Sequence, residues 1–117
     1  MKKIYHLSSC STCQRIIKEL APKKDVVLQD IKIEKISEKQ LEEMKKIVGS
    51  YEALFSRKAM KYRSLGLDKK QLTEEDYKKF ILEEYTFLKR PVILAGSTIF
   101  IGNAKATIEA AKRAFGN

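Results

Sequence analysis

Apolar and polar positions follow two different periods in the first part of this chain. Residues 3–7 form a short apolar-rich run that predicts a strand. Apolar residues then recur at helical spacing, namely Ile16, Ile17 and Leu20. We expect this helix to begin near Thr12 or Cys13 and to end at Pro22. Residues 26–31 predict a second strand, so the segment is a β-α-β unit with parallel strands and a right-handed crossover.

The middle of the chain has helical periodicity throughout. Ser37 followed by Gln40 is a capping-box sequence, and Gly49 marks the end of the helix that it opens. Residues 51–65 predict one or two short helices. A further helix is predicted by its cap, Thr73 with Asp76, and by its apolar stripe, Tyr77, Phe80, Ile81 and Tyr85.

Alternation returns near the end of the chain and completes the predicted fold. Residues 92–95 and 98–101 predict two antiparallel strands joined by a tight turn at Gly96 and Ser97. Asn103 is the expected N-cap of a final helix. The element order is β-α-β, then helices, then β-β-α around a four-stranded mixed sheet. This order predicts an α/β, thioredoxin-like (glutaredoxin-like) fold with a helical insertion.

Length and composition are those of one compact domain. The chain has 117 residues, of which 44% are hydrophobic, enough to form a core without metal or disulfide staples. We expect a single domain over residues 1–117, with the helical insertion at about 37–86. No apolar run approaches the roughly 18 residues that a transmembrane helix needs, and polar residues follow His6 before a signal peptide could form. We therefore expect a soluble, cytoplasmic protein with no membrane partner.

The net charge of +9 raises the question of nucleic-acid binding. The lysines are spread along the whole chain, however, and form no tail or long basic block. No helix-turn-helix signature or aromatic RNA-binding motif is evident. We interpret the charge as a solvated lysine-rich surface, and the sequence does not favour direct nucleic-acid binding.

The two cysteines, Cys10 and Cys13, form one C-x-x-C motif. As a structural staple they close a very short loop, for which the chain-entropy model gives only about 2 kcal/mol. A structural zinc site needs four ligands, and this chain supplies two cysteines and one histidine, His6, which we expect to be a partly buried strand residue. We therefore predict thiol chemistry and no metal.

The position of the motif matches that chemistry. Cys10 is expected between the first strand and the first helix, where a helix N-terminus with free N–H groups stabilises a thiolate. Cys13 lies one helical turn later and should be more buried, with a higher pKa. Cys10 is then the nucleophile, and Cys13 resolves its adduct as an intramolecular disulfide. Ser11 and Thr12, between the cysteines, are expected to support the site.

Pro91 is the third candidate for support of the site. It precedes a strand that is expected to face the cysteine loop, and X-Pro bonds are the usual place for a cis peptide. A cis bond here is typical of thioredoxin-like folds. A trans proline that merely begins the strand is the alternative, and the sequence leaves both open.

Three segments together resemble the arsenate reductase (ArsC)/Spx family of the thioredoxin-like superfamily. They are Y-H-L-S-S-C-S-T-C-Q-R at the start, G-S-Y-E-A-L-F-S-R-K-A-M-K-Y-R-S-L-G-L in the middle and K-R-P-V-I-L-A-G near the end. Their order and spacing cover essentially the whole chain. The family resembles glutaredoxins with a helical insertion, which is the architecture that the periodicity predicts.

This resemblance implies an arsenate reductase-like thiol oxidoreductase. Cys10 matches the nucleophile that attacks arsenate, while Arg57 and Arg90 match arginines that hold the oxyanion. Arginine suits this role because its forked donors fit a tetrahedral oxyanion and it stays charged. Each arginine could instead be a solvated or surface-paired side chain. No organic cofactor is implied, and the expected electron donor is a thiol reductant such as glutathione with glutaredoxin, or thioredoxin.

Two features resemble the Spx branch instead. Reductases of this family that couple to glutathione typically lack a second cysteine, whereas this chain has Cys13. They also carry an arginine after the last strand, where this chain has Gly102 and Asn103. Spx proteins are redox-switched transcriptional regulators that bind RNA polymerase. The alternative is therefore a regulator whose C-x-x-C is the switch and whose contact surface includes part of residues 37–66.

Overall fold

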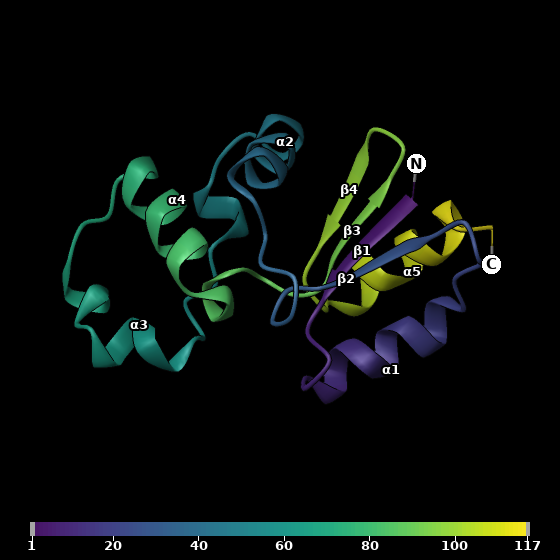
Figure 1. Ribbon diagram of the computed structural model, residues 1–117, viewed down its shortest axis with the longest axis horizontal. Coiled ribbons are helices and arrows are strands. Elements are labelled where there is room, and N and C mark those ends of the chain that lie inside the picture. The colour runs from purple at the N-terminus through teal and green to yellow at the C-terminus, as the bar shows by residue number, and fades with distance from the viewer. Residues whose placement is uncertain (1, 117) are drawn as a thin grey trace. The chain divides into compact units, whose positions relative to one another are not determined.

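The computed structural model describes residues 2–116, which form two compact units (Figure 1). The two ends of the chain, up to Lys35 and from Arg90 onward, form one unit around a β-sheet. The intervening segment, Ile36–Lys89, forms a second, helical unit. The helical insertion expected at about 37–86 falls within this second segment.

The first unit contains a four-stranded mixed sheet, as predicted. Its strands are β1 (Lys2–His6), β2 (Val27–Asp30), β3 (Val92–Ala95) and β4 (Thr98–Ile101). The strand order is β2-β1-β3-β4, with β1 parallel to β2 and antiparallel to β3, and with β3 and β4 forming a hairpin. His6 pairs with Asp30, and Tyr5 pairs with Val92. The carboxyl ends of β1 and β2 therefore lie beside the beginning of β3, which confirms the thioredoxin-like topology.

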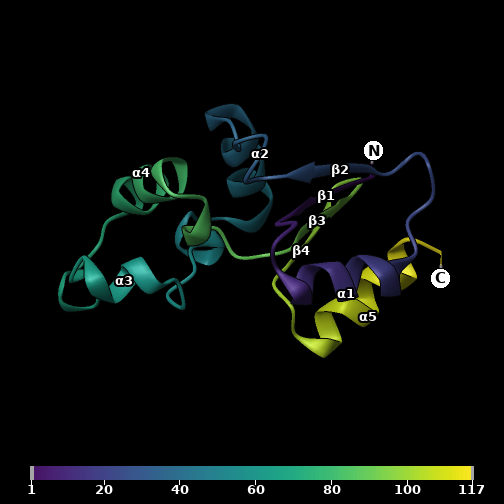
Figure 2. The ribbon, with the colours of Figure 1, turned by 60° about the horizontal axis from the view of Figure 1, so that its bottom comes forward.

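Two helices cover one face of this sheet. They are α1 (Ser11–Leu20) and α5 (Lys105–Ala114), which lie side by side in both views (Figures 1 and 2). Ile4 and Ile93 from the central strands pack with one face of the two helices, formed by Ile16, Leu20, Ile108 and Ala111, and with Phe115, which caps the end of α5. Burying each large aliphatic side chain of this cluster contributes roughly 1.5–3 kcal/mol to the stability of the fold. The cluster therefore holds α1 against the sheet.

The second unit is helical and has its own aromatic core. It contains α2 (Glu38–Val48), α3 (Met60–Ser64) and α4 (Glu74–Glu83), with short 3-10 turns η1 (Glu52–Leu54), η2 (Leu67–Lys69) and η3 (Tyr85–Phe87). Phe55 is fully buried. Its ring centroid lies 4.9 Å from that of Tyr77 and 5.0 Å from that of Phe87. These contacts hold the segment after η1 against α4.

Both predicted capping boxes are present. The Ser37 hydroxyl accepts the Gln40 N–H at 3.1 Å, and the Gln40 side chain accepts the Ser37 N–H at 3.0 Å. Thr73 and Asp76 make the same reciprocal pair at the start of α4. Gly49, with φ of 102°, ends α2 as predicted, because glycine adopts this left-handed conformation without steric cost.

Three helix ends differ from their predictions. The N-cap of α5 is Ala104 rather than Asn103, because Ala104 is the last extended residue and the Asn103 side chain lies one position too early to cap the helix. Tyr85 does not continue the apolar stripe of α4. That helix ends at Glu83, and the chain tightens into η3, which contains Tyr85. The first helix of the chain, α1, begins at Ser11, one residue before the expected start.

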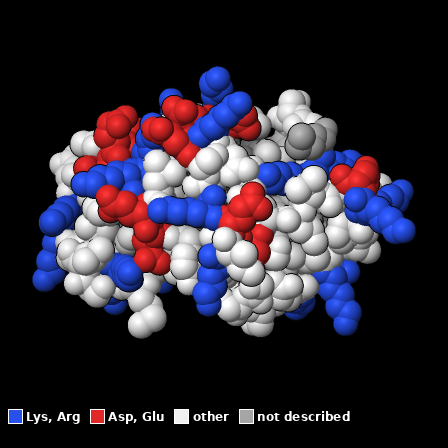
Figure 3. All heavy atoms as spheres, in the orientation of Figure 1, with Lys and Arg blue, Asp and Glu red and all other residues white. Residues whose placement is uncertain are grey.

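Charged side chains of both signs share the surface. On the face drawn in Figure 3, lysines and arginines are interspersed with aspartates and glutamates rather than gathered into one uninterrupted basic area. Several lysines are paired with nearby carboxylates. Lys78 contacts Glu38 at 2.8 Å, and Lys61 contacts Glu84 at 2.7 Å. Among the described residues, no helix is both long enough and apolar enough to cross a membrane.

Candidate functional site

Cys10 lies at the point where β1 gives way to α1. It is the N-cap of the helix, in extended conformation with φ of −94° and ψ of 111°. Its N–H donates to the Leu7 carbonyl at 3.0 Å, and its own carbonyl accepts the Gln14 N–H at 3.1 Å. The first turn of α1 contains no acidic residue. The N-terminal partial charge of the helix is therefore not opposed locally by a carboxylate.

The surroundings of Cys10 favour its thiolate. Partial burial alone would raise the pKa of Cys10, but this effect is outweighed. The backbone N–H and the thiol of Cys13, the positive charge of Arg90 and the backbone N–H of Thr12 together hold the pKa of Cys10 below its ordinary value. The side chain is partly exposed. Cys10 is thus a partly exposed thiol whose ionised form is favoured.

Cys13 has the opposite environment three residues later. Its side chain is fully buried, as the sequence predicts. Burial, together with the neighbouring Cys10 sulfur, raises the pKa of Cys13 to about 11. Both cysteines are free thiols. The two thiols therefore differ strongly in acidity although they share one helical turn.

Arg90 and Pro91 lie at the beginning of β3, beside the end of β1. The peptide bond between them is cis. Pro91 is buried, and its carbonyl accepts the Gly102 N–H at 3.0 Å. Because β3 runs antiparallel to β1, this dipeptide lies at the same edge of the sheet as Cys10. Arg90 contributes positive charge at both cysteines.

Two residues that the sequence did not single out support the cysteine loop. Asp30 Oδ1 accepts the Ser8 N–H at 3.3 Å and the Lys32 N–H at 3.1 Å, and hydrogen bonding by the Ser8 side chain is the main cause that lowers the pKa of Asp30. Gln14 Nε2 donates to the Leu7 carbonyl at 3.1 Å. The parallel pairing of the two strands could have identified Asp30, because it places the end of β2 beside the end of β1.

Ser11 and Thr12 occupy the first turn of α1. Ser11 is exposed and begins the helix, while Thr12 is partly buried. Thr12 supports the site through its backbone N–H, which stabilises the Cys10 thiolate.

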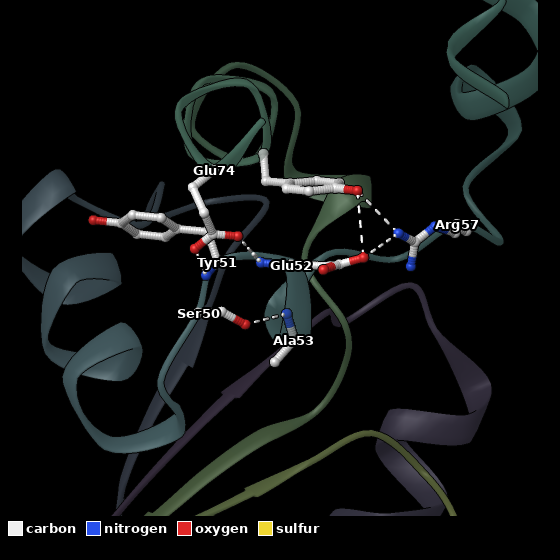
Figure 4. Close-up of polar contacts among 7 residues, drawn as sticks. Ser50, Tyr51, Glu52, Ala53, Arg57 and Glu74 are labelled. Carbon is white, nitrogen blue, oxygen red and sulfur yellow. Dashed lines mark hydrogen bonds and ion pairs between the residues drawn. The ribbon is translucent and has the colours of Figure 1, made fainter. Parts of the chain in front are cut away.

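Arg57 belongs to the helical unit and follows η1 by three residues. Its Nη2 donates to Glu52 Oε2 at 2.7 Å and to the Tyr77 hydroxyl at 2.9 Å (Figure 4). The guanidinium carbon also lies 5.7 Å from the centroid of the Tyr77 ring. The Glu52 carboxylate is the main cause that raises the pKa of Arg57, with further contributions from Tyr62 and Tyr77. The sequence predicts Tyr77 only as a core residue and does not single out Glu52.

The sheet unit thus brings together Cys10, Cys13, Arg90 and Pro91, and the helical unit holds Arg57. A thiolate, a second thiol one turn away and a fixed positive charge can carry out nucleophilic attack followed by disulfide formation. Across residues 2–116, no group of three or more histidine, cysteine, aspartate or glutamate side chains is arranged to hold a metal ion.

Comparison with known proteins gives a consistent result. The profile described as the ArsC family matches residues 5–111. An arsenate reductase from Vibrio cholerae is similar in structure, with a TM-score of 0.72, 20% identity, and coverage of 96% of this chain and 95% of that chain. An arsenate reductase (ArsC) related protein from Brucella melitensis has a TM-score of 0.70, 23% identity, and coverage of 93% and 92%. No curated protein sequence matches significantly.

Proposed function

This chain belongs to the ArsC family, and on that premise we propose that it is a thiol oxidoreductase that reduces arsenate. The observation that carries the proposal is the contrast between the two thiols. Cys10 is partly exposed with a lowered pKa, whereas the pKa of the buried Cys13 is about 11. A reaction that needs one attacking thiolate and one protonated resolving thiol uses this contrast directly.

The proposed reaction has two covalent steps. The Cys10 thiolate attacks arsenic and displaces an oxygen as water or hydroxide, which leaves a Cys10–arsenic(V) thioester. Cys13 then attacks the Cys10 sulfur, so that the sulfur–sulfur bond forms and the sulfur–arsenic bond breaks. The bonding pair stays on arsenic, which leaves as arsenite, and the Cys13 proton goes to an arsenite oxygen. Two electrons pass from the two thiols to arsenic, and the product is a Cys10–Cys13 disulfide.

Arginine side chains are proposed to hold the oxyanion during the attack. Arg90 is the first candidate, because it already contributes positive charge at the Cys10 sulfur. Arg57 is the second, by its match to the family motif. Each guanidinium offers charged donors that suit arsenate oxygens. Ser11, Thr12 and Pro91 support the cysteine loop in this proposal.

An external thiol reductant must return the disulfide to two thiols. We propose glutathione with glutaredoxin, or thioredoxin, because a disulfide is reduced by exchange with another thiolate and no bound cofactor is required. The oxidised protein is then the shared intermediate of every turnover. The reductant that supports turnover is a competent donor for this disulfide.

The first test is arsenate-dependent oxidation of the reductant by purified protein, with glutathione plus glutaredoxin and thioredoxin supplied in separate runs. Cys10→Ser should abolish turnover, because a serine hydroxyl is not ionised at neutral pH. Turnover that survives in this variant removes Cys10 from the mechanism. No turnover with either donor, in a protein that readily forms the Cys10–Cys13 disulfide, rejects the arsenate reductase proposal.

An Spx-like redox-switched regulator is the second candidate function. Two observations favour it: the presence of Cys13, and Gly102 with Asn103 where glutathione-coupled reductases of the family carry arginine. In this role the disulfide changes affinity for RNA polymerase instead of completing a turnover. Retention by immobilised RNA polymerase that differs between oxidised and reduced protein is the expected result. Lack of retention in both redox states contradicts it.

A further inference from the structure

The guanidinium of Arg57 is held at one nitrogen by two partners. Nη2 carries two hydrogens and makes two hydrogen bonds, to Glu52 Oε2 at 2.7 Å and to the Tyr77 hydroxyl at 2.9 Å. The Tyr77 hydroxyl in turn lies 3.5 Å from the same Glu52 oxygen. The three side chains therefore form a closed triangle of polar contacts.

This geometry determines how Arg57 can receive an oxyanion. A guanidinium binds an oxyanion most strongly when two parallel N–H groups donate to it. One such fork consists of Nε and Nη2, and the other consists of Nη1 and Nη2. Both forks need a hydrogen of Nη2. While Glu52 and Tyr77 occupy that nitrogen, Arg57 can offer an oxyanion single hydrogen bonds but neither fork.

The segment that carries Glu52 is itself fixed to α4. Both carboxylate oxygens of Glu74 accept backbone N–H groups, from Tyr51 at 2.8 Å and from Glu52 at 3.1 Å (Figure 4). Glu74 and Tyr77 are three residues apart and so lie on the same face of α4. One helix face thus holds both the backbone of Glu52 and the ring that stacks beside Arg57.

The Glu52 carboxylate can nevertheless separate from the Arg57 guanidinium. Its side chain is 54% exposed and that of Arg57 is 47% exposed, so water can solvate both groups when they separate. Exposed ion pairs of this kind are weak. The Glu74 contacts hold the backbone of Glu52 and leave its side chain free to rotate.

We propose that Glu52 is an internal competitor of the oxyanion at Arg57, and that Tyr77 is the positioning residue that keeps Arg57 in place when Glu52 is displaced. An oxyanion that binds through an Arg57 fork replaces the Glu52 carboxylate, one anion for another. Glu52 therefore lowers the affinity of Arg57 for oxyanions, so that weakly binding anions do not displace it. This inference rests on the proposed function, because it assigns the oxyanion to Arg57.

The test is the dissociation constant of arsenate, measured by titration calorimetry in a Cys10→Ser background so that no turnover occurs. Adding Glu52→Gln should lower that constant roughly two- to fivefold, the range expected when an exposed ion pair no longer has to be broken. Combining Glu52→Gln with Arg57→Ala should remove the gain, because the competition acts only through Arg57.

Glu42→Gln is the matched control. Glu42 lies in the same unit, is 49% exposed and contacts Lys78 at 3.6 Å, so its replacement changes the net charge equally without touching Arg57. Tyr77→Phe is a second variant, which keeps the ring but removes the hydroxyl that positions Arg57, and combining it with Glu52→Gln should reduce the gain in affinity; an undiminished gain contradicts the positioning role. A readout without arsenate is the rate at which phenylglyoxal modifies Arg57, followed by mass spectrometry. Glu52→Gln should raise this rate and Glu42→Gln should not.

The outcomes separate the inference from the function on which it rests. If Arg57→Ala weakens arsenate binding while Glu52→Gln behaves like Glu42→Gln or weakens binding, the competition is refuted and the proposed function stands. An unchanged phenylglyoxal rate in Glu52→Gln also refutes the competition. If Arg57→Ala leaves binding unchanged, or if no variant binds arsenate, both the inference and the role of Arg57 in the proposed function fail.

Discussion

At the scale of single residues, the two cysteines show how one helical turn separates two thiols chemically. Cys10 is the N-cap and receives stabilisation from N–H groups of the first turn and from Arg90. Cys13 is inside the helix and fully buried, where its ionised form loses water. The helix start alone does not produce this difference, because both residues lie near it. Burial by the surrounding fold does.

Removing the charge of Arg90 should raise the pKa of Cys10, because a nearby cation stabilises the thiolate. We expect Arg90→Leu to shift the pH midpoint of Cys10 alkylation by iodoacetamide upward, so that the rate at neutral pH falls. Arg15→Leu is the control, since Arg15 is an exposed α1 residue paired with Glu19 at 3.9 Å. An equal shift in both variants would show that overall charge, and not the position of Arg90, sets the pKa.

At the scale of elements, the helix ends are where the predictions from sequence differ from the structure. Ser37 and Thr73 are recognised from sequence because each is followed three residues later by a side chain that returns the hydrogen bond. Asn103 has no such partner, and Ala104 takes the N-cap position. A residue type that favours caps is therefore a weaker predictor than a reciprocal pair.

This difference has a measurable consequence for stability. Ser37→Ala should lower the free energy of unfolding by about 1 kcal/mol, because it leaves the Gln40 N–H without its acceptor. Asn103→Ala should change it by less than about 0.5 kcal/mol, as surface substitutions usually do. Urea denaturation monitored by circular dichroism compares the two variants. Equal losses would contradict the assignment of Ala104 as the N-cap.

At the scale of the whole molecule, each unit has its own core. The sheet unit packs the central strands against α1 and α5, and the helical unit packs α3 and α4 with the aromatic cluster around Phe55. The cysteines and Arg90 depend on the first core, and the Arg57 triangle depends on the second. A substitution in one core therefore reaches the site residues of that unit first.

Ile93→Ala tests the first core. Ile93 is fully buried in the central strand β3, so the loss of its side chain should lower the free energy of unfolding by roughly 2–5 kcal/mol. Ile33→Ala removes the same atoms from a side chain that is 83% exposed, and it should have little effect. The free energies are measured by urea unfolding. A small loss in Ile93→Ala would contradict the packing of α1 and α5 on this strand.

The order of elements, both capping boxes, the hairpin turn and the Cys10–Cys13 motif could be predicted from the sequence, because each depends on residues that are close along the chain. Periodicity, turn glycines and reciprocal caps are local signals. The parallel and antiparallel pairing of the strands could also be predicted, since the lengths of the connections between strands permit few alternatives.

Other features depend on residues that are distant along the chain, and only the tertiary structure decided them. The support of the cysteine loop by Asp30 and the hydrogen bond from Arg57 to Tyr77 are of this kind. A carboxylate 20 or more residues from its partner leaves no local pattern; Ser8 and Asp30 are 22 residues apart. The sequence by itself thus determined which groups are candidates for the chemistry, and the packing of the chain decided which of them meet and how deeply each is buried, and so the acidity of each thiol.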